Sequence, residues 1–208
     1  MSNAQHIEAK SSALLLNDLQ LAIISGSPLA SSDPAVVDRM NAVVDRCASA
    51  LEAARHAGML VVHVRIAFSP GYPEASPHSP MMRFMRDKCV LLDGDPSTAF
   101  DPRVAPKRDE LVITKHGVSA FAGTSLEQML RVRGVGTVIL GGLVTHYAVD
   151  GTARDAHDRG FRVIVLKDGC ASATPERHEA SLANLSFLAE IFAIEDLALR
   201  VDGSPGAV

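Results

Sequence analysis

Two charged residues that follow apolar runs carry side chains suited to acid–base chemistry. Asp18 lies at the end of the run ALLLNDLQ, residues 13–20, and Lys115 is the last residue of the run ELVITK, residues 110–115. A carboxylate beside an ammonium group shifts the pKa values of both, and a pair of this kind can transfer protons to and from a substrate. Structural roles are also open, because Asp18 is suited to capping a loop and Lys115 to a solvated position at a strand end.

A third feature is the paired glycines Gly141 and Gly142, which lead from an apolar run into an expected helix. Free backbone amides and the positive end of the helix dipole make such a helix start a cradle for an oxyanion or a carboxylate. The residue expected to point from this helix start into a pocket is Ala148, whose methyl group has no reactivity. Neither a P-loop nor a G-x-G-x-x-G pattern is present, so no nucleotide cofactor is expected.

The histidines and cysteines do not predict a metal site. No H-E-x-x-H pattern occurs, no D-x-H element accompanies Arg65 in the second apolar run, and the three cysteines are widely spaced without a C-x-x-C. Four histidines remain candidate hydrogen-bond donors in a pocket, and a structural or surface role is open for each. They are His63, His78, His116 and His146.

Strand and helix patterns alternate along the whole chain and would position these residues. Strands are expected at residues 13–20, 59–68, 110–115, 135–142 and 161–169, with a weak edge strand at 195–203. Helices are expected from Pro34 to Gly58 and over residues 124–134, 145–160 and 174–192. Continuous apolar strands separated by helices predict an α/β fold of three α-β-α layers, with a doubly wound, mostly parallel, Rossmann-like sheet of about six strands. In such sheets the ligand binds beyond the carboxyl ends of the strands.

One single domain is expected over residues 1–208, with short tails at both ends of the chain. A Pro- and Ser-rich segment, residues 69–89, shows little periodicity and is expected to be a loop that helps to close a site.

Charge and hydropathy exclude several classes of function. The formal net charge is −4 and no extended Lys/Arg run occurs, which argues against nucleic acid as a partner. No apolar run approaches the length of a membrane span, so neither a membrane partner nor a membrane anchor is expected. We therefore expect a cytoplasmic protein with a small-molecule substrate.

Taken together, these segments resemble the isochorismatase-like (cysteine hydrolase) family over nearly the whole chain. ALLLNDLQ is similar to the opening strand that carries the family's aspartate, VITKHGVSAFAGTSLEQMLRVRGVGTVILGGLVTH to its lysine segment and glycine turn, and TARDAHDRGFRVIVLKDGCA to the helix and strand that follow. The resemblance implies that Asp18 and Lys115 are catalytic and that Ala148 stands at the position of the nucleophilic cysteine. It also implies a homo-oligomer, a dimer or a tetramer.

The resemblance carries further expectations for the pocket. A cis peptide is implied between Leu143 and Val144, with the amides of Val144 and Ala148 forming an oxyanion hole. The metal-binding D-x-H element of nicotinamidase-like members is absent near Arg65, so no metal is expected. Proximity along the chain adds five candidate residues that line the substrate pocket, namely Phe68, Tyr72, Phe121, His146 and Tyr147.

Three functions remain open from the sequence. The favoured one is a cysteine-independent hydrolase, similar to isochorismatases that hydrolyse a vinyl ether without a cysteine, in which Asp18 transfers protons and Lys115 tunes its pKa. The second is a cysteine amidohydrolase that is inactive because Ala148 replaces the nucleophile. The third is a non-catalytic protein that binds a ligand with the same fold.

Overall fold

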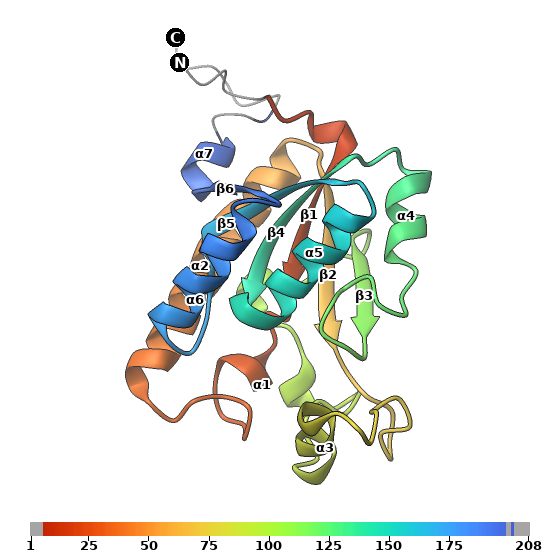
Figure 1. Ribbon diagram of the computed structural model, residues 1–208, viewed down its shortest axis with the longest axis vertical. Coiled ribbons are helices and arrows are strands. Elements are labelled where there is room, and N and C mark those ends of the chain that lie inside the picture. Colours follow the sequence, from red (N-terminus) through yellow and green to blue (C-terminus); the bar gives the residue numbers. More distant parts are fainter. Residues whose placement is uncertain (1–5, 199–200, 202–208) are drawn as a thin grey trace.

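Apolar segments without alternation form the strands of one sheet (Figure 1). The computed structural model describes residues 6–198 and residue 201. The strands are β1 (Ser12–Asn17), β2 (Leu60–Ile66), β3 (Leu111–Lys115), β4 (Thr137–Leu143), β5 (Arg162–Ala171) and β6 (Glu190–Phe192). Their order is β3-β2-β1-β4-β5-β6, and each neighbouring pair is parallel. The predicted doubly wound sheet is therefore confirmed.

Helices cover the two faces of the sheet and bury its apolar side chains. Helix α2 (Pro34–His56) packs on one face together with the short α7 (Ile194–Ala198). Helices α4 (Leu126–Val132), α5 (Asp150–Asp158) and α6 (Pro175–Leu185) cover the other face. All residues of the central strands β1 and β4 are buried, which explains why their sequences are continuously apolar rather than alternating.

Local signals set the start and the end of α2 as predicted. The Asp33 side chain accepts a hydrogen bond from the amide of Ala35 at 2.9 Å, and Pro34 occupies the first helical position, where its missing N–H is not needed. Gly58 follows the helix with φ +64°, a conformation that glycine adopts without strain. The apolar stripe of α2 includes Val44, fully buried against the sheet.

A third apolar cluster lies beyond the carboxyl ends of the strands, where Figure 1 shows α1 (Leu21–Ile24) and α3 (Pro80–Asp87) below the arrowheads. Helix α3 is part of the segment that was predicted to be a loop. Ser79 caps it by accepting from the amide of Met82, and Met82 and Met85 bury one face of the helix. The prediction of an irregular loop was wrong here because two turns of helix are too short to show periodicity.

The end of the chain also differs from the prediction. The helix expected over 174–192 ends at Leu185, and the sixth strand is β6 rather than 195–203, because residues 190–192 pair with β5. Residues 194–198 form α7, and residues 199–200 and 202–203 of the expected strand lie outside the described residues. The tail residues 1–5 and 204–208 also lie outside them.

Candidate active site

The order in which the chain adds strands to the sheet reverses between β1 and β4. The candidate site lies at this switch point. From β1 the chain continues to α2 on one face, and from β4 it continues to α5 on the other face. Diverging connections leave room for a ligand beyond the two strand ends. Asp18 follows β1, Lys115 ends β3 and Ala148 follows β4, so three segments far apart in sequence meet here.

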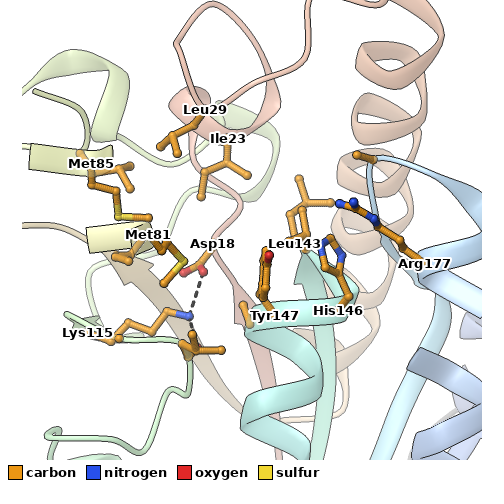
Figure 2. Close-up of a pocket in the computed structure, with 17 residues that line it drawn as sticks. Asp18, Ile23, Leu29, Met81, Met85, Lys115, Leu143, His146, Tyr147 and Arg177 are labelled. Atoms are coloured by element: carbon orange, nitrogen blue, oxygen red, sulfur yellow. Dashed lines mark hydrogen bonds and ion pairs between the residues drawn. The ribbon is translucent and has the colours of Figure 1, made fainter. Parts of the chain in front are cut away.

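Asp18 and Lys115 form a buried ion pair, drawn as a dashed line in Figure 2. The distance from Lys115 Nζ to Asp18 Oδ2 is 2.8 Å, and the two side chains are 1% and 7% exposed, respectively. Lys115 Nζ also donates to the carbonyl of Val118 at 2.7 Å, which fixes the ammonium group. The other carboxylate oxygen, Asp18 Oδ1, is buried and has no hydrogen-bond partner among the described residues.

The backbone at Asp18 directs this carboxylate. Its φ is +53°, in the left-handed region that non-glycine residues enter rarely, apart from Asp and Asn. The Asp18 amide donates to the carbonyl of Val64 in β2 at 2.8 Å, which holds the unusual conformation in place. The chain therefore leaves the strand sharply and keeps the carboxylate at the sheet edge.

Burial raises the pKa of Asp18 above its ordinary value, and the charge and hydrogen bond of Lys115 oppose this rise without cancelling it. Lys115 therefore tunes the pKa of Asp18, as the sequence interpretation expected, but the effect of burial is larger. A carboxyl group whose pKa is raised can both release and accept a proton, which is the requirement for general acid–base catalysis.

Ala148 lies in a π-helical turn, Thr145–Val149, that joins β4 to α5. Its methyl group is buried and lines the same pocket as Asp18 and Lys115. The peptide bond between Leu143 and Val144 is cis, as the family resemblance implied. No nucleophilic side chain is available at residue 148, because a methyl group cannot attack a carbonyl.

A hydrogen-bond network holds β1, α5 and the loop after β3 together behind the pocket. Asn17 Nδ2 donates to the carbonyl of Gly141 at 3.2 Å, and Thr152 Oγ1 donates to Asn17 Oδ1 at 3.4 Å. The same threonine oxygen accepts from the amide of Ala120 at 3.0 Å. Gly142 must be glycine here, because a Cβ at this residue would lie 2.0 Å from the carbonyl oxygen of Asn17.

The pocket is a cavity of about 290 Å³ with mainly apolar walls (Figure 2). Its size suits a small molecule. Five lining side chains carry polar or charged groups inside this apolar frame, namely Asp18, Lys115, His146, Tyr147 and Arg177. The apolar walls include Ile23, Leu29, Ile66, Met81, Met85, Leu91, Val118, Leu143, Val144 and Ala173.

Two of the five predicted pocket residues line this cavity and three do not. His146 and Tyr147 are in its wall. Phe68 and Tyr72 instead pack on each other in the third apolar cluster, and the Tyr72 hydroxyl donates to the carbonyl of Val90. Phe121 packs against Phe161 in the core between the sheet and its helices. Placing them in the pocket was wrong because closeness along the chain does not fix the direction of a side chain in a loop.

Two of the histidines considered as donors in the pocket, His63 and His116, lie elsewhere, and so does Arg65. His63 is buried and its Nε2 lies 2.9 Å from Oε2 of Glu110, at the amino end of β3. Arg65 pairs with Asp93, and His116 Nδ1 lies 2.7 Å from a backbone carbonyl oxygen. None of them lines the pocket with Asp18.

The sequence interpretation missed Arg177 and two of the three methionines of α3, Met81 and Met85. Arg177 follows the carboxyl end of β5 in the first turn of α6, so the rule that ligands bind beyond strand ends could have indicated it. Met81 and Met85 gave no such signal, because only tertiary packing brings α3 over the pocket.

Other kinds of site have little support within the described part of the chain. Residues 6–198 and 201 contain no group of three or more His, Cys, Asp or Glu side chains that could hold a metal ion. In the same residues, no helix has both the length and the apolar character needed to cross a membrane.

A doubly wound parallel sheet with a buried carboxylate–ammonium pair in a pocket at its switch point defines an α/β protein with an enzyme-type site. A family model described as the Isochorismatase domain matches residues 12–196, and the chain belongs to this family of hydrolases. The resemblance predicted from the sequence is thereby confirmed.

The chain is also similar to named members of this family. The chain is 35% identical over 176 residues to a maleamate amidohydrolase of Pseudomonas putida, covering 85% of this chain and 79% of that protein. It is 30% identical over 191 residues to a ureidoacrylate amidohydrolase of Methylorubrum extorquens, covering 86% and 77%. The crystal structure of an N-carbamoylsarcosine amidase from Thermoplasma acidophilum superposes with a TM-score of 0.72 at 26% identity, covering 89% of this chain and 97% of that one.

Proposed function

We propose that the protein is a hydrolase of a small molecule that uses Asp18 as its proton-transferring group and water, rather than a thiol, as its nucleophile. The observation that carries the proposal is the buried oxygen Asp18 Oδ1, which lacks a partner in the described chain while Oδ2 is held by Lys115. A buried polar atom without a partner costs about 1–3 kcal/mol, so the arrangement suits an atom that receives a hydrogen bond from water or substrate.

The chemistry of the pair fits two kinds of substrate. With an enol ether, Asp18 protonates the terminal vinyl carbon, water adds to the adjacent carbon, and the adduct breaks down to an alcohol and a ketone. With an amide, Asp18 takes a proton from water as the oxygen attacks the carbonyl and returns this proton to the leaving nitrogen. The C–N bond then breaks, ammonia departs, and the other product is a carboxylic acid that ionises to the carboxylate. In both, Lys115 stabilises negative charge next to the reacting atoms.

The backbone amides of Val144 and Ala148 complete the proposed site. Both residues line the pocket beside Asp18. In the proposal their N–H groups stabilise the oxyanion that forms when water attacks an amide carbonyl. The proposal includes no metal and no cofactor.

A second candidate is a cysteine amidohydrolase that has lost its nucleophile. The relatives named above are amidohydrolases and an amidase, and Ala148 lies in the same pocket as the pair that would activate a thiol there. This candidate differs from the first in one measurable respect, since it gives the chain no turnover until Ala148 is replaced by cysteine.

A paired turnover screen separates the candidates. The chain, Ala148→Cys and Asp18→Asn are incubated with isochorismate and a panel of small amides that includes maleamate, and pyruvate and ammonia are measured. Turnover by the chain that Asp18→Asn abolishes supports the first proposal, and turnover that survives Asp18→Asn refutes its mechanism. Turnover by Ala148→Cys alone supports the second candidate. No turnover by any form, with the ligand recovered unchanged, favours the non-catalytic protein.

The oligomeric state and the location stay part of the proposal. We propose a homodimer or homotetramer, on the basis of the family resemblance, and a cytoplasmic location, on the basis of the charge and hydropathy of the sequence. Sedimentation equilibrium on the purified chain tests the first point, since a monomer at micromolar concentration would refute it. Fractionation of the source cells tests the second.

A further inference from the structure

A pair of polar side chains ties the turn that follows β4 to helix α6. Thr145 is the first residue of the π-helical turn and is fully buried. Its Oγ1 lies 2.9 Å from Nδ1 of His178, a half-buried residue of α6. Within residues 6–198 and 201 this is the only hydrogen bond of the Thr145 hydroxyl, so His178 supplies the partner that a buried hydroxyl requires.

His178 itself does not line the pocket that holds Asp18. It lines a separate cavity of about 350 Å³, whose walls come from α2, β5 and α6. Burial lowers the pKa of the His178 imidazole below its ordinary value, and the charge of Glu179 opposes this only in part. The imidazole is therefore neutral near pH 7, and an effect of His178 on a substrate in the pocket must pass through Thr145.

The backbone pairing of the sheet does not extend to this turn. The ladder between β4 and β5 ends with the pair Leu143 and Ala171. In the turn, the carbonyl of Val144 accepts from the amides of Tyr147 and Val149 at 3.2 and 3.4 Å, both longer than the usual ~3.0 Å. A turn with such long internal bonds depends on side-chain contacts for a fixed position.

A second contact between a hydroxyl and an imidazole supports the same turn. Nδ1 of His146 lies 2.8 Å from Oγ of Ser172, which is fully buried directly after β5. The two contacts thus join successive residues of the turn to the segment that leads from β5 into α6. Loss of the contact at Thr145 leaves the contact at His146 and the sheet in place, so we expect variants of His178 to fold.

We propose that His178 is a positioning residue of the reaction, which acts through its hydrogen bond to Thr145. The bond holds the backbone amides of Val144 and Ala148 in the arrangement that stabilises an oxyanion. The inference rests on the proposed function, because the oxyanion role of these amides is part of that proposal. Thr145 follows Val144 directly and precedes Ala148 by three residues, so a displaced Thr145 moves both amides. A misplacement of about 1 Å can cost on the order of 100-fold in rate.

Amide hydrogen exchange, measured by NMR on the ¹⁵N-labelled chain at pH 7, tests the bond without any substrate. The reporters are the amides of Tyr147 and Val149, whose bonds to the carbonyl of Val144 open when the turn moves. His178→Leu and Thr145→Val each remove one partner, and the double variant removes both. His178→Asn and Thr145→Ser are the conservative variants, because each keeps a polar atom close to the position of the original one.

Two controls separate the turn from the rest of the molecule. Ser181→Ala is the matched variant, because Ser181 is a buried hydroxyl residue of the same helix that makes no hydrogen bond to the turn. The amide of Gly136 is the internal reference, because it is bonded to the carbonyl of Ser11 at 2.8 Å at the other end of β4 and reports a loss of global stability.

His178→Leu and Thr145→Val should each speed exchange of the two reporter amides about 5-fold, the factor that one net hydrogen bond represents. The double variant should be no faster than either single variant, because both remove the same bond, and the conservative variants should keep most of the protection. Unchanged exchange in the single variants overturns the inference, as does a double effect equal to the product of the single effects. An equal acceleration in Ser181→Ala or at Gly136 also overturns it, because the cause would then be helix packing or global stability.

Turnover is read separately, in whichever form of the chain the screen described above shows to be active. His178→Leu should lower kcat by about 10-fold or more with KM unchanged, and His178→Asn should restore most of the loss. A change in KM alone overturns the positioning role. Absence of turnover in every form refutes the hydrolase proposal and with it the catalytic use of the turn, whereas the exchange data decide independently whether His178 holds the turn.

Discussion

Replacing Lys115 by methionine removes the positive charge from the buried pair while keeping a side chain of similar length and volume. The Lys115 side chain is 1% exposed and its partner Asp18 is 7% exposed, so water cannot take over the lost contact without rearrangement. Asp18 Oδ1 already lacks a partner within the described chain, and Lys115→Met leaves Oδ2 without its ammonium partner as well. The variant therefore buries an uncompensated carboxyl group.

The expected loss in the free energy of unfolding is about 3–5 kcal/mol at pH 8, the range for breaking one side of a buried ion pair. For a chain of this length this corresponds to a fall in Tm of roughly 10 °C. Asp18→Asn is the appropriate second change, because asparagine tolerates the φ of +53° at this position. The double variant is expected to recover most of the loss, since it no longer buries a group that can ionise.

The loss must also depend on pH, and its sign follows from the direction of the pKa shift. Burial raises the folded-state pKa of Asp18 above the value of 3.8 that it has when unfolded. A raised pKa means that the stability contributed by the protonated form is complete below the unfolded pKa and is lost as the pH rises through the folded pKa. Without Lys115 the folded-state pKa of Asp18 rises further. The free energy of unfolding that Lys115→Met loses should therefore be smallest at pH 4 and largest at pH 8.

Urea denaturation followed by far-UV circular dichroism between pH 4 and pH 8 measures these quantities, because the chain has no tryptophan for a fluorescence assay. A loss below about 1 kcal/mol at pH 8 would refute the argument that the pair is buried and coupled. A loss of the same size at pH 4 and pH 8 would refute the assignment of the effect to ionisation of Asp18.

Three further predictions concern the frame of the site. Gly142→Ala should lower the free energy of unfolding by more than about 4 kcal/mol or prevent folding, because the new Cβ would lie 2.0 Å from the carbonyl oxygen of Asn17 and the φ of residue 142 is +115°. Gly136→Ala should be tolerated, because the space around Gly136 is open. Thermal melts compare the two variants. Thr152→Val removes the hydroxyl that pairs with the amide of Ala120 and with Asn17 Oδ1, and should lower the free energy of unfolding by about 1–3 kcal/mol. Thr152→Ser keeps the hydroxyl and should lower it less, and urea titration measures both. Glu110 has a pKa of about 2, since its hydrogen bonds to Arg55, to a backbone amide and to a histidine outweigh the effect of burial. It stabilises the fold above its unfolded pKa of 4.5 and loses this contribution as the pH falls towards 2, so Glu110→Gln should flatten the acid-induced loss of stability in that window.

Local sequence signals were sufficient for the regular elements that have them. Strands β1 and β4 were found because strands buried on both faces need continuous apolar residues. Helix α2 was found because Asp33, Pro34 and Gly58 give it a defined start and end. Helix α3 and strand β6 were missed, because elements of eight and three residues have too few turns or pairs to produce a pattern.

The sequence also determined the ion pair in the pocket. Asp18 and Lys115 end apolar strands, and the geometry of parallel sheets brings strand ends to one edge, so their meeting followed from order and chemistry alone. The alanine at residue 148 is likewise read directly from the chain.

Only the tertiary structure decided which other side chains surround that pair. Phe68 and Tyr72 turn into their own cluster, whereas Met81, Met85 and Arg177 line the cavity. The direction of a loop or helix-end side chain depends on all the packing around it, and no short stretch of sequence contains that information. Asp18 Oδ1 has no partner among residues 6–198 and 201, and the pKa of Asp18 is raised. Both have the same origin, because burial is the summed effect of atoms contributed by many distant segments.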